Sequence, residues 1–255
     1  MAGECVFCCV DLKGISADEH IFPKWLLRHL GIPKTDQMFQ GAGDEATLDT
    51  DELGGRTHGT WRFVEGRVCQ GGNNGWFSDL ERDTRPGLEA LIENAGRLVA
   101  LTLAQRLLLA RWAAKTAFLI ANVSPFQRPV PRGHLWAMNN GGNVPAGVAV
   151  FGCQSGTPTT TAYLQSTVWP QFHRRGSGIP VGAVANAYKI GLQIRDLMLL
   201  VAFTPQSGTD FITAAGVHIP LNPQKQLWYC YFAEMPEKPQ PPPWIFTRSL
   251  AVLVP

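Results

Sequence analysis

The 255-residue sequence predicts an α+β protein. One long apolar segment has helical character, several runs rich in β-branched and aromatic residues have strand character, and turn-rich segments separate them. With 45% apolar and 16% charged residues, the chain has enough apolar side chains to bury a core, which excludes a disordered chain. We expect two parts, residues 1–86 and 87–255, with the boundary near Thr84-Arg-Pro-Gly.

The first part predicts short elements joined by a long loop. A proline suits the first turn of a short helix over residues 25–29, and a glycine then ends it. Residues 34–59 are rich in Gly, Asp, Glu and Thr and predict a long acidic loop. Residues 60–68 alternate enough to predict a strand or hairpin that ends at Cys69, and the later part of the segment that follows is helical in character.

The second part predicts one buried helix followed by a sheet. Thr102 and Gln105 form a capping-box pattern, and the helix after it is expected to run to about residue 121. Because that helix is apolar over most of its circumference, we expect it at the centre of this part. Strands of a mostly antiparallel sheet are predicted at 159–169, 183–194 and 197–203, with further candidates at 212–219 and 227–232.

Charge is unevenly distributed along the chain. The net charge of +2 argues against a dedicated nucleic-acid binder, yet it combines −6 over residues 1–90 with +8 over the remainder. The N-terminus has neither the basic nor the apolar region of a secretory signal. No uninterrupted apolar stretch reaches the roughly 20 residues that span a bilayer. We therefore expect a cytoplasmic protein without a membrane partner.

Three cysteines have the spacing of a partial zinc site. Cys5-x-x-Cys8 is spaced as half of a tetrahedral site, and Cys69 supplies a third thiolate. Without an export signal, metal binding is a better interpretation of paired cysteines than a disulfide. A regular second pair needs a cysteine at position 72, which is Gly72. Three thiolates with water or another ligand can hold zinc, and the alternative is that no zinc binds.

A carboxylate and an imidazole are adjacent between these cysteines. Glu19 and His20 precede Ile-Phe-Pro, which places them at the end of a strand. A hard cation prefers carboxylate and amide oxygens, and a neutral histidine accepts a proton from water near neutral pH. Asn73 and Asn74, after the Cys69 turn, supply amide oxygens that could approach the same centre. For His20 alone, the alternative is a half-buried histidine with satisfied hydrogen bonds.

These blocks together resemble the HNH endonuclease family. They are Cys-x-x-Cys from residue 5, Glu-His-Ile-Phe-Pro-Lys-Trp-Leu from residue 19, and Asn-Asn-Gly-Trp-Phe-Ser-Asp-Leu-Glu from residue 73. The resemblance covers about residues 4–85, and Trp112-Ala-Ala-Lys115-Thr116-Ala117 is similar to a later segment of bacterial and phage members. It implies a ββα-metal module clamped by structural zinc, followed here by a helical segment and a β-rich extension.

The resemblance also implies roles for individual residues. His20 becomes the general base, and Glu19 a ligand of a single catalytic Mg²⁺ or Mn²⁺. Asn73 or Asn74 stands at the family's final ligand position, and the resemblance does not choose between them. The family's central residue has no clear match, and His58 is a candidate only by its place in the chain. The implied activity is hydrolysis of phosphodiester bonds in DNA, with RNA as the other nucleic acid.

Two further hypotheses stand beside this one. Gly72 favours a catalytically impaired HNH-like protein that binds nucleic acid or regulates another process. The other hypothesis gives residues 125–255 a separate role as an interaction or homo-oligomerisation domain. Within this basic part, Arg174 and Arg175 in a glycine-rich loop are candidate substrate-binding residues that contact phosphates.

Overall fold

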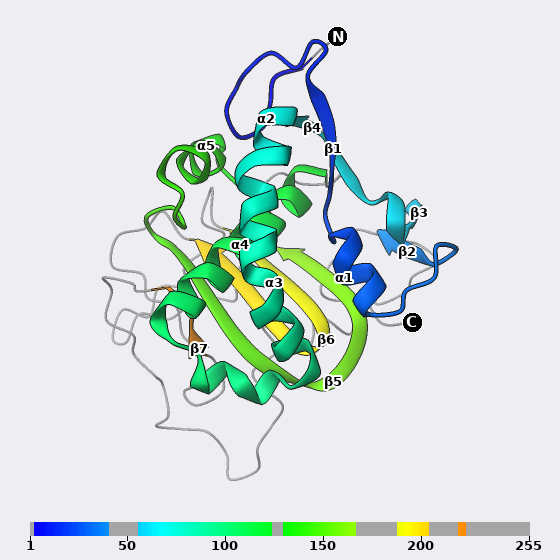
Figure 1. Cartoon of the computed structure of the whole chain (residues 1–255), viewed down its shortest axis with the longest axis vertical. Helices are drawn as coiled ribbons and strands as arrows, with labels where there is room; N and C mark the ends of the chain where they lie inside the picture. The colour runs from blue at the N-terminus through cyan, green and yellow to red at the C-terminus, as the bar shows by residue number, and fades with distance from the viewer. Residues whose placement is uncertain (1–2, 41–55, 124–129, 167–187, 204–218, 223–255) are drawn as a thin grey trace, which may run out of the picture.

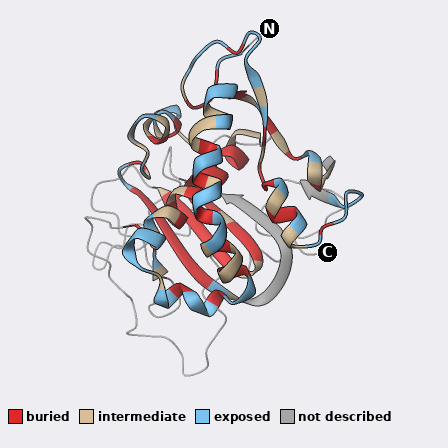
Figure 2. Ribbon diagram, in the orientation of Figure 1, coloured by how far each residue is buried: buried red, intermediate tan, exposed pale blue. Residues whose placement is uncertain are grey.

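A computed structural model of the chain describes residues 3–40, 56–123, 130–166, 188–203 and 219–222, and it confirms the α+β class. Helices α3 and α4 pack against each other and cross one face of an antiparallel sheet (Figure 1). A smaller unit of short strands and helices lies beside them. Buried residues are concentrated in α4 and in the sheet strands beneath it (Figure 2).

The N-terminal elements are built around one antiparallel strand pair. β1 (Ser16–His20) pairs with β4 (Val64–Cys69), with Glu19 opposite Glu65 and Ser16 opposite Cys69. A helical run follows β4, which is loosely compatible with a ββα order. Between the two strands, the chain forms α1 (Lys24–His29) and η1 (Thr60–Arg62).

The predicted acidic loop at residues 34–59 is wrong at both of its ends. β2 (Gln37–Gln40) and β3 (Arg56–Gly59) pair antiparallel as a second small sheet. The many Gly, Asp and Glu residues between the two strands dominate the composition of the whole segment, so two strands of four residues were not visible in it. Residues 41–55 lie outside the described part of the chain.

The helical run after β4 continues through the expected boundary. It consists of α2 (Gln70–Gly72), η2 (Asn73–Phe77) and α3 (Ser78–Glu93). Pro86 lies inside α3, and buried residues at helical spacing on both sides hold this helix against the core: Leu80, Thr84, Leu88 and Leu91. One hydrophobic core includes side chains from both expected parts, and the division into 1–86 and 87–255 stays a prediction.

The predicted central helix is confirmed. After η3 (Ala95–Ala100), α4 (Leu103–Val123) begins with a reciprocal capping box. The Thr102 N–H donates to Gln105 Oε1 at 2.9 Å, and the Gln105 N–H donates to Thr102 Oγ1 at 3.3 Å. Trp112 and Phe118 are fully buried. No helix formed by the described residues is both long enough and apolar enough to span a membrane.

The antiparallel sheet is confirmed, with different strand limits. β5 (Val148–Ser166) begins 11 residues before the predicted start at residue 159, and α5 (Arg132–Gly141), which the sequence analysis missed, precedes it. β6 (Tyr188–Phe203) is one strand where two were predicted. The strand continues through the polar residues Arg195 and Asp196, which separate the two predicted strands. Arg195 has a positive φ of 50° and lies opposite Thr159, where the register with β5 is irregular, so the polar residues form a bulge within one strand.

β7 (Ile219–Pro220) completes the sheet in the order β6-β5-β7. Within β5, Cys153 is buried, as expected for a small apolar residue. The candidate strand at 227–232 lies outside the described residues, as does most of the candidate at 212–219.

Candidate functional site

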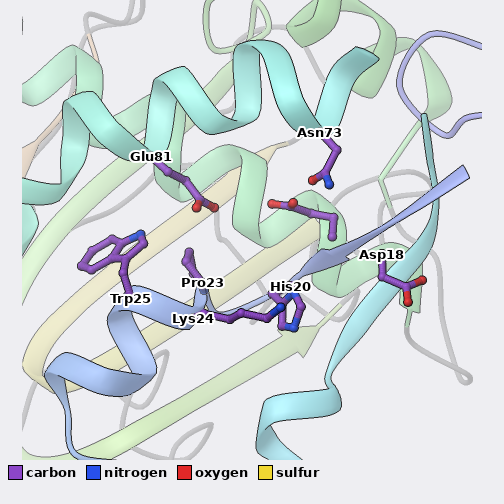
Figure 3. Close-up of a pocket in the computed structure, with 8 residues that line it drawn as sticks. Asp18, His20, Pro23, Lys24, Trp25, Asn73 and Glu81 are labelled. Carbon is purple, nitrogen blue, oxygen red and sulfur yellow. The ribbon is translucent and has the colours of Figure 1, made fainter. Parts of the chain in front are cut away.

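A cavity of about 280 Å³ lies where the end of β1, the start of α1 and the helical run of η2 and α3 meet (Figure 3). The Asn73 and Glu81 side chains project from the helical run toward the end of β1, and the Lys24 side chain extends toward His20. The residues that line the cavity are Asp18, Glu19, His20, Pro23, Lys24, Trp25, Asn73 and Glu81.

Three residues singled out in the sequence meet in this cavity. Glu19 and His20 line it from β1, and Asn73 lines it from η2. Asn74 is exposed and is not among the lining residues, so the geometry favours Asn73 as the amide next to Glu19 and His20. The backbone of His58 lies in β3, paired with Met38, and the structure does not describe its side chain.

A fully buried lysine contacts two of the carboxylates that line the cavity. Lys115, from the middle of α4, places its Nζ 2.5 Å from Glu19 Oε1 and 2.7 Å from Glu81 Oε1. The Lys115 side chain is 0% exposed, and its Nζ also lies 5.0 Å from the centre of the Phe77 ring. Strand β1, helix α3 and helix α4 are therefore joined by one ammonium group.

The charges in this cluster explain its protonation states. Burial raises the pKa of Glu19, and the Glu81 carboxylate acts in the same direction, while the Lys115 charge opposes both. For Lys115, burial acts to lower the pKa, but the carboxylates of Glu19 and Glu81 outweigh it and raise the pKa above its ordinary value. The ammonium therefore stays charged, because two carboxylates compensate its desolvation.

A second buried carboxylate also faces α4. Glu65, opposite Glu19 in the strand pair, is buried and accepts a hydrogen bond from the Asn122 side chain. It also accepts from the Arg67 backbone N–H at 2.8 Å. Sequence reasoning missed these partners, although a lysine in a helix as apolar as α4 was a usable signal, since lysine is seldom fully buried without a partner.

The surroundings of His20 shift the pKa of its imidazole. Its burial lowers the pKa, and the nearby Lys24 charge lowers it further, while Asp18 and Glu81 act in the opposite direction. The net effect places the pKa below its ordinary value of 6.5. The imidazole is therefore neutral at neutral pH and has a nitrogen lone pair available to accept a proton.

The three predicted zinc ligands are gathered in one cluster. The Sγ atoms of Cys5, Cys8 and Cys69 all lie within 4.8 Å of one another, and Cys8 Sγ is 3.6 Å from Cys69 Sγ. Sulfur atoms that bind one zinc ion tetrahedrally, with Zn–S bonds of about 2.3 Å, are separated by distances close to that between Cys8 Sγ and Cys69 Sγ. The cluster therefore fits zinc. Burial acts to raise the pKa of Cys5, but backbone N–H groups, chiefly of Cys8 and Phe7, lower it below its ordinary value.

Gly72 lies directly beside this cluster. Its N–H donates to Cys69 Sγ at 3.3 Å. A Cβ built at Gly72 would lie 3.4 Å from Cys69 Sγ and 3.9 Å from Val68 Cγ1, which are ordinary contact distances. Its φ of −70° and ψ of −48° are helical, so the backbone does not require glycine. Position 72 would therefore accept a side chain next to the thiol cluster.

The cavity offers oxygen donors of the kind that a hard cation takes: the carboxylates of Glu19 and Glu81 and the amide oxygen of Asn73. Within the part of the chain that the structure describes, Cys5, Cys8 and Cys69 form the one group of at least three Cys, His, Asp or Glu ligand atoms that approach one another within 4.8 Å.

Arg174 and Arg175, the predicted phosphate contacts, lie outside the described residues. Comparisons of the chain with models of protein families, with curated proteins and with solved structures found no match. The likeness to HNH endonucleases therefore rests on the sequence blocks alone.

Proposed function

We propose that this protein is a metal-dependent endonuclease of the HNH type that hydrolyses phosphodiester bonds of DNA. The observation that carries the proposal is the cavity shared by Glu19, His20 and Asn73, three residues that belong to the sequence blocks resembling the HNH family. The cysteine cluster at the start of the same helical run supports it, since zinc there would hold the end of β4, from which the run begins, against the N-terminal turn.

In this proposal, His20 is the general base that removes a proton from the attacking water. Its lowered pKa keeps the imidazole neutral, and its position at the cavity wall leaves it beside the Lys24 side chain. Lys24 lines the same cavity, and its ammonium would contact a phosphate oxygen.

Glu19 and Asn73 would hold the divalent cation, Mg²⁺ or Mn²⁺, through a carboxylate and an amide oxygen. A divalent cation at such a site stabilises negative charge on the phosphate and on the leaving oxygen. Glu19 is oriented for this task by its ion pair with Lys115, and the η2 helix carries Asn73 directly after the cysteine turn.

The test is cleavage of supercoiled plasmid and of labelled oligonucleotides by the purified protein over a range of Mg²⁺ and Mn²⁺ concentrations. We expect metal-dependent cleavage that is lost in His20→Ala and retained in His29→Ala, a histidine on α1 that pairs instead with Glu93. Intact substrates under all of these conditions, or equal loss in both variants, would contradict the proposal.

The second candidate is a protein that keeps the module's shape and binds nucleic acid without cleaving it. Gly72 at the fourth cysteine position favours it, because a weakened zinc site loosens the elements that carry the proposed ligands. Retention of DNA in a filter-binding assay, together with no cleavage at any metal concentration, would favour this second function.

A further inference from the structure

Lys115 is a buried charge that the proposed chemistry leaves without a direct task. Its Nζ contacts one carboxylate from β1 and one from α3, at 2.5 Å from Glu19 and 2.7 Å from Glu81. The Phe77 ring covers it at 5.0 Å from Nζ, and the side chain is fully buried. Lys115 is thus a monovalent cation fixed between two carboxylates that both line the cavity.

A pair of carboxylates is also a common ligand set for a divalent cation in proteins. Here the Lys115 ammonium already donates hydrogen bonds to Glu19 Oε1 and Glu81 Oε1, the oxygen atoms that would coordinate such an ion. The Lys115 ammonium is the positive charge that lets the buried Glu19 and the partly buried Glu81 stay ionised side by side. Without it, the two carboxylates would need either a proton or another cation between them, and a divalent cation can serve as that counter-charge.

We infer that the Lys115 ammonium occupies the position between Glu19 and Glu81 that a second divalent cation would otherwise take, and that it limits the cavity to one such ion. The inference deepens the proposed function, on which it rests for the first cation. Lys115 then acts as a positioning residue. Its ion pair holds Oε1 of Glu19, and Oε2 of Glu19 remains for the first cation.

The experiment counts Mn²⁺ ions bound to the full chain by electron paramagnetic resonance of free Mn²⁺ and by isothermal titration calorimetry. We expect Lys115→Met to bind one more Mn²⁺ per chain than the wild type, and Mn²⁺ to raise its unfolding midpoint more than that of the wild type. An equal count in Lys115→Met and in the wild type would overturn the inference.

Two further variants separate this effect from a loss of packing. Thr116→Val alters the neighbouring, fully buried residue, whose hydroxyl has no hydrogen-bond partner among the described residues, and should keep the wild-type count. Lys115→Met with Glu81→Gln leaves one of the two carboxylates and should lose the additional ion. An additional ion in either of these variants would contradict the role assigned to the two carboxylates.

Folding of Lys115→Met is itself informative. If this variant folds only in the presence of Mn²⁺, while the double variant folds without it, a divalent ion has replaced the ammonium, as inferred. If Lys115→Met stays unfolded in Mn²⁺ and the double variant folds, the position does not accept such an ion and the inference fails. A wild-type count of zero with one ion in Lys115→Met would refute the proposed catalytic cation and still support the role of Lys115.

Discussion

Glu19 and Glu65 stand opposite each other in the β1–β4 pair, and each of these buried carboxylates contacts a different polar residue of α4. Glu19 pairs with Lys115, and Glu65 accepts a hydrogen bond from Asn122, seven residues further along the helix. Residues seven apart lie on the same face of an α-helix, after about two turns. The strand pair that carries the proposed base is therefore attached to the central helix of the following part at two polar points.

We expect Asn122→Ala to lower the free energy of unfolding by about 1–3 kcal/mol, because it leaves an oxygen of the buried Glu65 with fewer hydrogen bonds. Asn140→Ala, at an exposed position of α5, serves as the control and should change it by less than about 0.5 kcal/mol. Urea denaturation followed by tryptophan fluorescence measures both. Equal stability of the two variants would show that the Asn122 contact contributes nothing.

A fragment of residues 1–86 should fail to fold cooperatively even with zinc. It retains Glu19, Glu65 and Glu81 but lacks Lys115 and Asn122, so three carboxylates lose their α4 partners and the helix that covers them. Circular dichroism during heating measures this, with the full chain as the reference. A sharp unfolding transition of the fragment would show instead that residues 1–86 are an independent domain.

Much of the site could be predicted because its signals are local. Glu19 and His20 are adjacent, and Asn73 directly follows a cysteine turn, so short patterns suffice to group them. Lys115 and Glu19 are 96 residues apart, and no periodicity in the sequence says which buried carboxylate meets which buried cation. Local patterns also miss β2 and β3, because each of these short strands forms only by pairing with the other. They miss the continuity of β6 as well, because it depends on the positive φ of Arg195.

His20 should titrate below its ordinary pKa of 6.5, because burial and the Lys24 charge both disfavour the protonated imidazole. Lys24→Met removes the positive charge and should move this pKa upward. Nuclear magnetic resonance of the imidazole ring during a pH titration measures both values without requiring activity. If His20 is the general base, the acid limb of the cleavage rate moves to higher pH in Lys24→Met by the same amount. An unchanged titration in Lys24→Met would show that the two groups do not interact.

Gly72→Cys should complete a four-thiolate zinc site. The Cβ it introduces lies 3.4 Å from Cys69 Sγ in helical backbone, so the new thiol can join Cys5 and Cys8 without strain. We expect about one equivalent of zinc that resists a chelator better than in the wild type, and a higher unfolding temperature, since metal binding of this kind stabilises the folded state. Gly71→Cys is the matched control, because a Cβ at that exposed neighbour meets no atom within 4 Å. Elemental analysis after chelator treatment decides between them, and equal zinc retention in the two variants would mean that position 72 has no special relation to the thiol cluster.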